Sequence, residues 1–90
     1  MRRSAVLIKG QVQGVFYRAH AVDVARGRDL RGWVRNLSNG DVEALVEGPD
    51  EAVQAFVAWA YDGSPAAYVE EVFVTEQPYV GDLGDFEIRD

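Results

Sequence analysis

The feature that most constrains the fold is a glycine turn near the middle of the chain. Residues 38–41 read Ser-Asn-Gly-Asp and separate two runs that are rich in strand-forming residues, 30–37 (LRGWVRNL) and 42–48 (VEALVEG). Asn-Gly between two such runs is typical of a β-hairpin, because both residues tolerate a positive φ. The sequence therefore predicts two adjacent antiparallel strands at the centre of the protein.

A strand followed by a helix is predicted before this hairpin. Residues 4–9 (SAVLIK) have the composition and alternation of a strand, and residues 10–17 form a loop. Residues 18–26 follow with alanine and valine at positions 21, 22 and 25, which form one stripe at helical spacing.

The second half repeats this order and adds a strand. Residues 48–63 contain the clearest helix pattern, with Pro49 near its start, acidic residues in its first turn and an apolar stripe of Val53, Phe56, Val57 and Ala60. Residues 67–77 are rich in valine and predict a further strand. Residues 85–89 (DFEIR) predict a short last one.

The resulting order, β-α-β-β-α-β-β, is that of an α+β ferredoxin-like sandwich. We expect one mostly antiparallel sheet of four to five strands with both helices on one face, formed by a single domain of residues 1–90. The right-handed crossover rule places the third strand between the first and the second. This arrangement brings the loop at residues 10–17 close to the hairpin strands.

The composition excludes several classes of site. The chain has no cysteine and a single histidine, His20, so disulfides, thiolate nucleophiles and cysteine- or histidine-based metal centres are not expected. No run of eighteen apolar residues predicts a membrane span. The apolar run at the N-terminus is about five residues long and meets Lys9, so we interpret it as the first strand rather than a signal peptide. These observations predict a cytoplasmic protein.

Charge is distributed unevenly along the chain. Residues 1–40 carry eight basic side chains against two acidic ones, a net charge of +6, whereas residues 41–90 carry one against thirteen, a net charge of −12. The overall charge of −6 argues against a nucleic-acid backbone as the main partner, since phosphate-backbone binding needs a basic face. An anion site, if present, belongs in the first half.

The loop at residues 10–17 is one candidate for such a site. Gly10 and Gly14 permit a positive φ, so that successive N–H groups can converge on an anion beside the start of a helix. Arg18 adds a planar, permanently charged group suited to bidentate contact with phosphate or carboxylate. The composition of the loop alone favours an ordinary turn followed by a surface arginine.

Asn36 is the second candidate, because asparagine is disfavoured inside a strand. It is either a functional side chain near the loop, or a structural one: a polar residue on the solvated side of the sheet or a side chain close to the hairpin. His20 is interpreted as an exposed or partly buried histidine rather than a general base. Arg35 shares a strand face with Trp33, which indicates a cation–π contact or a surface role.

The sequence resembles the acylphosphatase family in its small single-domain form. Residues 10–18 (GQVQGVFYR) match the family pattern Gly-x-Val-Gln-Gly-Val-x-aromatic-Arg at every fixed position, and residues 32–49 (GWVRNLSNGDVEALVEGP) carry its Gly-Trp-Val-x-Asn and Gly-Pro elements. Residues 63–72 and 86–89 extend the resemblance over nearly the whole chain. One stretch departs from the family: Arg28 and Asp29 occupy places where a leucine and a glycine or asparagine are usual, which puts the end of the first helix in doubt.

The resemblance implies a function and a set of site residues. The family hydrolyses acyl phosphates, the mixed anhydrides of a carboxylic acid and phosphate, and needs no metal, cofactor or covalent enzyme intermediate. Arg18 matches its phosphate-binding arginine, and Asn36 matches the asparagine that positions the attacking water. The phosphate cradle matches the backbone N–H groups of Gln13, Gly14, Val15, Phe16, Tyr17 and Arg18. A small acyl phosphate is then the substrate, inorganic phosphate is product and inhibitor, and a monomer is the default.

Two other functions are known for this class of fold. Ferredoxin-like sandwiches also serve as RNA-binding modules and as small-ligand regulatory domains, so the fold alone does not decide. An RNA reader needs aromatic side chains on the open sheet face and a basic surface. The strands after residue 40 are acidic and show no such aromatic motif, and a regulatory module would usually be attached to an enzyme.

Overall fold

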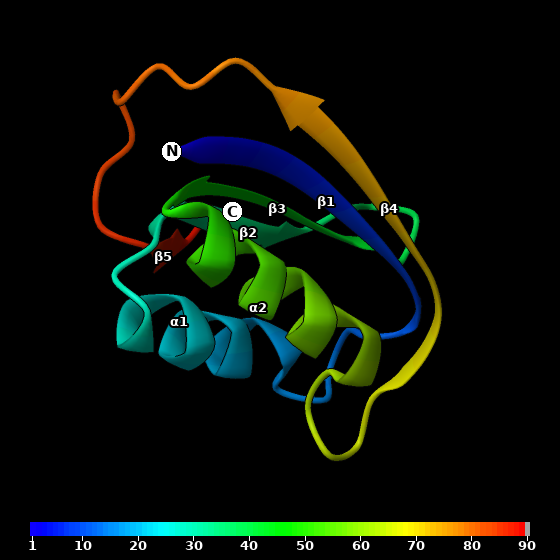
Figure 1. The fold of residues 1–90 in the computed structure, drawn as a ribbon. Coiled ribbons are helices and arrows are strands. Elements are labelled where there is room, and N and C mark those ends of the chain that lie inside the picture. Colours follow the sequence, from blue (N-terminus) through cyan, green and yellow to red (C-terminus); the bar gives the residue numbers. More distant parts are fainter. Residues whose placement is uncertain (90) are drawn as a thin grey trace.

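The structure is a computed structural model that describes residues 1–89, and Asp90, the end of the predicted domain, lies outside the described residues. Its elements in chain order are β1 (Arg2–Gln11), α1 (Tyr17–Gly27), β2 (Arg31–Asn36), β3 (Val42–Gly48), α2 (Asp50–Asp62), β4 (Tyr68–Gln77) and β5 (Glu87–Ile88). The five strands form one sheet in the order β4-β1-β3-β2-β5. Both helices lie side by side against the same face (Figure 1).

This architecture confirms the ferredoxin-like fold predicted from the sequence. The pairs β1–β3, β1–β4 and β2–β3 are antiparallel, and only β2–β5 is parallel. The third strand lies between the first and the second, as the crossover rule requires. The end of β1 and the β2–β3 hairpin therefore meet at one end of the sheet.

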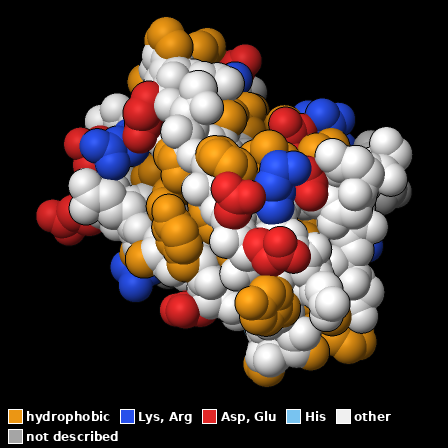
Figure 2. All heavy atoms as spheres, turned by 90° about the vertical axis from the view of Figure 1, so that its right-hand side faces the viewer, with side chains coloured by type: hydrophobic (Ala, Val, Ile, Leu, Met, Phe, Trp, Pro, Cys, Tyr) orange, Lys and Arg blue, Asp and Glu red, His pale blue; other side chains and the backbone are white. Residues whose placement is uncertain are grey.

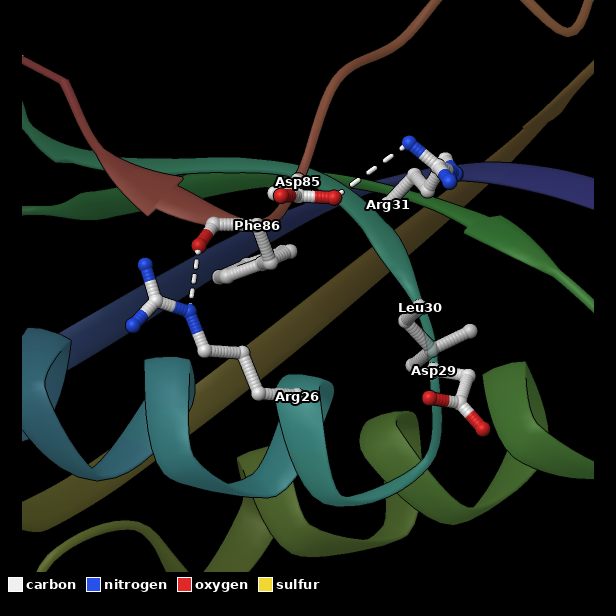
Figure 3. A pocket seen from close by; sticks show the side chains of 6 residues that line it. All are labelled: Arg26, Asp29, Leu30, Arg31, Asp85 and Phe86. Carbon is white, nitrogen blue, oxygen red and sulfur yellow. Dashed lines mark hydrogen bonds and ion pairs between the residues drawn. The ribbon is translucent and has the colours of Figure 1, made fainter.

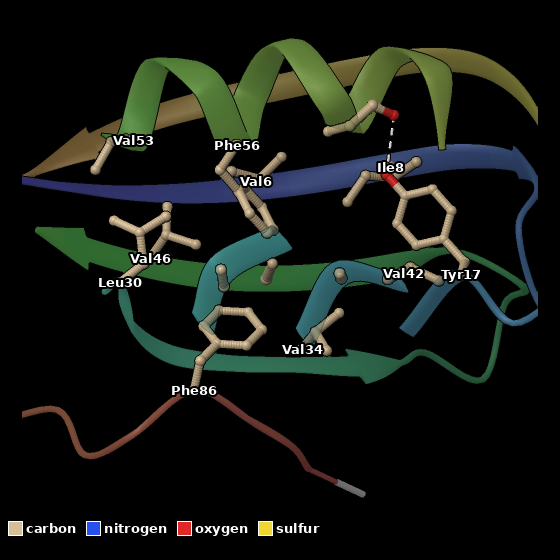
Figure 4. Packing of buried hydrophobic residues seen from close by; sticks show 14 of the residues in the cluster. Val6, Ile8, Tyr17, Leu30, Val34, Val42, Val46, Val53, Phe56 and Phe86 are labelled. Atoms are coloured by element: carbon tan, nitrogen blue, oxygen red, sulfur yellow. Dashed lines mark hydrogen bonds between the residues drawn. The ribbon is translucent and has the colours of Figure 1, made fainter. Parts of the chain in front are cut away.

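The core forms where the helices cover the sheet. Val6 and Ile8 of β1 are fully buried, as the alternation of that strand predicts, and they pack with Phe56 of α2. Figure 4 shows side chains from β1, β2, β3 and both helices meeting in this layer, with Phe86 entering from just before β5. The periodicity of the apolar residues thus fixes which face of each element is buried.

The predicted hairpin is confirmed, because β2 and β3 pair as antiparallel neighbours. Of the two turn residues that tolerate a positive φ, Gly40 adopts one, of 96°, and Asn39 does not. The N–H of Gly40 donates to the carbonyl of Leu37 at 3.2 Å, and the N–H of Leu37 donates to the carbonyl of Asp41 at 2.8 Å. The connection is therefore a longer loop with a left-handed glycine, which Asn-Gly also permits.

The loop after β1 is shorter than predicted, because the strand continues through Gln11. Its register against β4 shifts between Lys9 and Gly10, where Gly10 has a φ of 134°. A Cβ at Gly10 would overlap the carbonyl oxygen of Tyr68. Glycine is therefore required there for a bulge and a close backbone approach, and not for the loop itself.

Arg28 and Asp29, where the sequence departs from the family pattern, form the C-terminal end of α1. The N–H groups of Leu30 and Asp29 donate to the carbonyls of Ala25 and Arg26 at 2.9 and 3.2 Å. Asp29 has a φ of 56°, and Leu30 is buried. This is the Schellman arrangement, with an aspartate in the left-handed position where glycine is usual.

The segment after β4 crosses to the other edge of the sheet (Figure 1). The buried carboxylate of Glu47 fixes it, because one of its oxygens accepts the N–H groups of Val80 and Gly81 at 3.1 and 3.2 Å. The last strand is shorter than the predicted residues 85–89: only Glu87 and Ile88 pair with β2, and an isolated bridge joins Asp85 to Arg31.

Candidate active site

The loop at residues 12–16 joins β1 to α1 and has an unusual backbone. Gly14 has a φ of 74°, as its residue type predicts, and Phe16 has a φ of 61° and a ψ of 23° directly before the helix. Val15 between them, and Tyr17 after them, are not in this left-handed region. Alternation of this kind turns neighbouring N–H groups toward one side of the chain. The sequence predicts Phe16 as a backbone donor but not its left-handed conformation, because an aromatic residue carries no signal for it.

Three of these N–H groups have no recorded partner in the described part of the chain. Among residues 1–89, the structure records no hydrogen bond donated by the N–H of Gly14, Val15 or Phe16. The dipole of α1 adds a partial positive charge at the same point, since its N-terminus follows the loop directly. The loop therefore combines available donors with a potential that favours an anion.

Side chains from three directions hold this loop in place. Gln13 Nε2 donates to the carbonyls of Leu37 and Asp41 at 2.8 and 2.9 Å. Ser64 Oγ, just after α2, donates to the carbonyl of Val15 at 2.6 Å. The buried hydroxyl of Tyr17 donates to the carbonyl of Ala60 at 2.9 Å, as the dashed line in Figure 4 marks.

Two of these anchors were not expected from the sequence. No role is predicted for Ser64, and Tyr17 is predicted only as a backbone donor. Their partners lie 49 and 43 positions away in the chain, so no local pattern could have shown them.

A pocket of about 250 Å³ lies beside the loop and brings the two predicted side chains together. Arg18 and Asn36 both line it, and so do Gly14, Phe16 and Tyr17 of the predicted phosphate-binding residues. Gln13 and Val15 do not line it. The other lining residues are Val12, Ala19 and Ile88. Residues from the 12–16 loop, α1, β2 and β5 thus converge on one cavity.

Asn36 faces the helix side of the sheet, in line with the buried Val34 of the same strand. The alternative of a residue on the solvated side is therefore wrong. Its Oδ1 is buried and has no hydrogen-bond partner among residues 1–89. Because a buried polar atom normally has a partner, an acceptor left open beside a pocket marks a position for a bound group.

His20 and Arg35, the remaining candidates from the sequence, have the structural or surface roles that the sequence predicts. His20 is exposed, with Nδ1 3.0 Å from the carbonyl oxygen of Phe16. The guanidinium of Arg35 lies 5.1 Å from the ring centroid of Trp33, which confirms the predicted cation–π contact, and Arg89 lies 5.0 Å from the same ring.

Two ionisable groups next to the loop have shifted pKa values. Burial raises the pKa of Tyr17 well above its usual value, so its phenol stays a neutral donor. The hydrogen bond with Asp41, 2.7 Å from Lys9 Nζ to Oδ2, raises the pKa of Lys9. Asp41 also accepts from Asn39 Nδ2 at 3.1 Å, so its carboxylate ties the hairpin turn to β1.

A larger pocket, of about 480 Å³, lies at the opposite end of α1 (Figure 3). Its two arginines already have protein partners: Arg26 Nε donates to the carbonyl of Phe86 at 3.0 Å, and Arg31 pairs with Asp85 at 3.3 Å. Neither predicted site residue reaches this pocket, and its charged groups are of both signs. It is therefore not the candidate site.

The surface around the predicted site is mixed in charge. Figure 2 shows lysine and arginine side chains standing apart among acidic and hydrophobic ones on the face at the loop end of the sheet.

Within residues 1–89, no three His, Cys, Asp or Glu side chains gather in a cluster that could hold a metal ion. No helix in the described part of the chain has the length and apolar character needed to cross a membrane.

Comparison with known proteins identifies the family. The acylphosphatase family model matches residues 4–88. The acylphosphatase of Natronomonas pharaonis is 53% identical over 97% of this chain and 94% of its own length, and that of an Anaeromyxobacter species is 49% identical over 99% and 96%. The crystal structure of the Bacillus subtilis acylphosphatase superposes with a TM-score of 0.96 at 38% identity, covering both chains fully. The chain therefore belongs to the acylphosphatase family of hydrolases, which cleave acyl phosphates.

Proposed function

We propose that this acylphosphatase binds the phosphoryl group of its substrate on the 12–16 loop and attacks it with a water molecule held by Asn36. The backbone N–H groups of Gln13, Gly14, Val15, Phe16, Tyr17 and Arg18 form the cradle, and the Arg18 guanidinium completes it. The observation that carries the proposal is the convergence of this loop, Arg18 and Asn36 on one pocket.

The cradle is supported by the left-handed conformations of Gly14 and Phe16. A phosphoryl group spreads its negative charge over three oxygens, and N–H groups that are fixed in advance stabilise that charge without rearranging during the reaction. The anchors to Ser64 and Ala60 supply this rigidity. Arg18 adds two parallel donors with a permanent charge.

The role of Asn36 is supported by its open, buried Oδ1. This oxygen accepts a hydrogen bond from the water and orients its lone pair toward phosphorus. The water oxygen bonds to phosphorus as the bond from phosphorus to the acyl oxygen breaks, and the carboxylate leaves with that electron pair. A phosphoryl oxygen takes the proton from the water, so no general base of the protein is needed.

This mechanism suits the residue types present in the pocket. An acyl phosphate already has a good leaving group, and phosphoryl transfer requires mainly positioning and charge stabilisation. An arginine, a set of backbone donors and one amide supply these. With no cysteine and one exposed histidine, the chain offers no constellation for covalent catalysis.

Substitution of Arg18 tests the proposal. We expect Arg18→Ala to lower kcat/KM for acetyl phosphate on the order of a thousandfold, which corresponds to about 4 kcal/mol. Arg18→Lys should not restore activity, because a point charge does not reproduce the planar fork. Arg28→Ala, at an exposed position beyond the other end of α1, is the matched control. More than about a tenth of wild-type turnover in Arg18→Ala would contradict the assignment.

Inorganic phosphate gives a second test, because it mimics the group bound by the cradle. We expect it to inhibit competitively and to protect the folded protein against thermal unfolding. EDTA should leave activity unchanged, and a loss that a divalent ion restores would refute the metal-free mechanism. A cytoplasmic monomer that acts on a diffusible small molecule completes the proposal.

A further inference from the structure

Two exposed apolar side chains stand at the mouth of the candidate pocket. Phe16 is 77% exposed and Ile88 is 45% exposed, and both line the same cavity as Arg18 and Asn36. They come from opposite ends of the chain. Phe16 precedes α1, and Ile88 pairs with Val34 in the parallel β2–β5 ladder, two residues along β2 from Asn36.

The side chain and the backbone of Phe16 lie in different surroundings. Its N–H belongs to the proposed cradle, whereas the ring projects into solvent from a left-handed residue. A bulky residue in this conformation is strained, and strain of this kind concentrates at ligand sites.

Charge in the pocket is concentrated at one point. Among the lining side chains of residues 1–89, Arg18 is the only charged one: Val12, Phe16, Ala19 and Ile88 are apolar, and Asn36 and Tyr17 are uncharged. Once Arg18 binds the phosphoryl group, a second anionic group on the acyl side would face Phe16, Ile88 and Ala19, and this lining offers it no second cation. An uncharged acyl group would instead cover apolar surface that is now exposed to water.

We propose that Phe16 and Ile88 form the acyl-group subsite, which favours apolar acyl groups, aromatic or branched, over acyl groups with a second carboxylate. The inference rests on the proposed placement of the phosphoryl group at the 12–16 loop. Because the rim is partly open, we expect a preference of about tenfold for an apolar acyl group, near the lower end of what one hydrophobic pocket achieves.

The test compares kcat/KM for three substrates: benzoyl phosphate, acetyl phosphate and succinyl monophosphate. The wild-type protein should prefer benzoyl phosphate and should use succinyl monophosphate least. In Ile88→Ala the benzoyl-to-acetyl ratio should fall several-fold, because the smaller side chain removes apolar surface that a benzoyl group would cover. In Ile88→Lys the succinyl-to-benzoyl ratio should rise by about tenfold, because the lysine supplies the missing cation.

Two further variants complete the test. Phe16→Asn replaces the ring by a side chain that tolerates the left-handed conformation. The benzoyl-to-acetyl ratio of kcat/KM then reports the contribution of the ring, even if the variant also weakens the cradle. Val80→Ala is the control, because Val80 is 61% exposed on the segment held by Glu47, at the other end of the sheet. Its substrate ratios should match those of the wild type.

The outcomes distinguish the subsite from the proposed mechanism. If hydrolysis of all three substrates depends on Arg18 but both Ile88 variants keep the wild-type ratios, the subsite is wrong and the phosphate site stands. If hydrolysis does not depend on Arg18, the phosphate site itself is wrong, and the subsite inference fails with it. A wild-type preference for succinyl monophosphate would also overturn the inference.

Discussion

Gln13 Nε2 lies 2.8 Å from the carbonyl oxygen of Leu37, the residue that follows Asn36, and 2.9 Å from the carbonyl oxygen of Asp41. One amide group therefore joins the proposed phosphate loop to both ends of the β2–β3 hairpin turn. This contact fixes the position of the proposed phosphate loop relative to Asn36, the residue proposed to hold the water. Gln13 acts here as a positioning residue, through its side chain as well as its backbone.

Gln13→Met should lower turnover more than it weakens phosphate binding. Methionine has a similar length but cannot donate, so the carbonyls of Leu37 and Asp41 lose a partner and the protein should be destabilised by about 1–3 kcal/mol. We expect kcat to fall about tenfold, because a small displacement of Asn36 from the phosphoryl group is costly. The inhibition constant of inorganic phosphate should change by less than about threefold.

The matched control is Gln54→Met, at an exposed position of α2. It should leave kcat, phosphate inhibition and the free energy of unfolding near their wild-type values. Unchanged kcat in Gln13→Met, despite the loss of stability, would show that the amide only supports the fold.

Asn36→Ala should affect turnover far more than stability. If Oδ1 orients water, the loss appears mainly in the transition state, so kcat should fall at least a hundredfold while phosphate affinity stays nearly constant. Removal of a buried acceptor that has no partner within residues 1–89 should be neutral or mildly stabilising. Steady-state kinetics and thermal protection by phosphate measure both on one sample. Parallel losses of turnover and protection would assign Asn36 to phosphate binding instead.

The stability of the protein should fall in alkaline solution. Burial raises the pKa of Tyr17 above 10 in the folded state, so the unfolded chain releases this proton first, and stability is lost as the pH rises beyond 10. The raised pKa of Lys9 acts in the same direction: its pairing with Asp41 stabilises fully below its ordinary pKa of 10.5 and is lost as Lys9 deprotonates.

Tyr17→Phe isolates the first of these effects. At pH 7 the variant should be less stable by about 1–2 kcal/mol, because the buried carbonyl of Ala60 loses its donor. Between pH 9 and pH 11, roughly, its stability should fall less steeply than that of the wild type. Urea unfolding across this range measures the slope, and Tyr61→Phe, at a residue 58% exposed, is the control. Equal slopes in Tyr17→Phe and wild type would contradict the buried phenol as the cause.

Asp29 offers a stabilising substitution. Its φ of 56° suits glycine, and its carboxylate lies at the negative end of the α1 dipole. Asp29→Gly should raise the free energy of unfolding by about 0.5–1 kcal/mol, because glycine adopts this conformation without strain. This is a net value, since the greater freedom of glycine in the unfolded chain acts in the opposite direction. Asp29→Asn keeps a side chain and removes only the charge, and it should give about half of that gain. A loss of stability in both variants would show that the aspartate makes a contact worth more than the strain.

The sequence alone determined the architecture and indicated the candidate site residues. The periods of the apolar residues assigned each helix and strand its buried face, and the Asn-Gly turn together with the handedness of the crossover set the strand order. These are local or topological properties, so they can be read without coordinates. Arg18 and Asn36 could be named because the motifs around them are contiguous in the chain.

Tertiary structure alone decided how those side chains are held. Phe16 adopts a left-handed backbone because the loop is pinned by Ser64, Gln13 and the buried Tyr17, and no property of an aromatic residue predicts this. The pocket mouth joins Phe16 to Ile88, which are 72 positions apart. Such contacts depend on packing between distant segments, and their energy exceeds the local preferences of a few residues, so a pattern in one segment cannot reveal them.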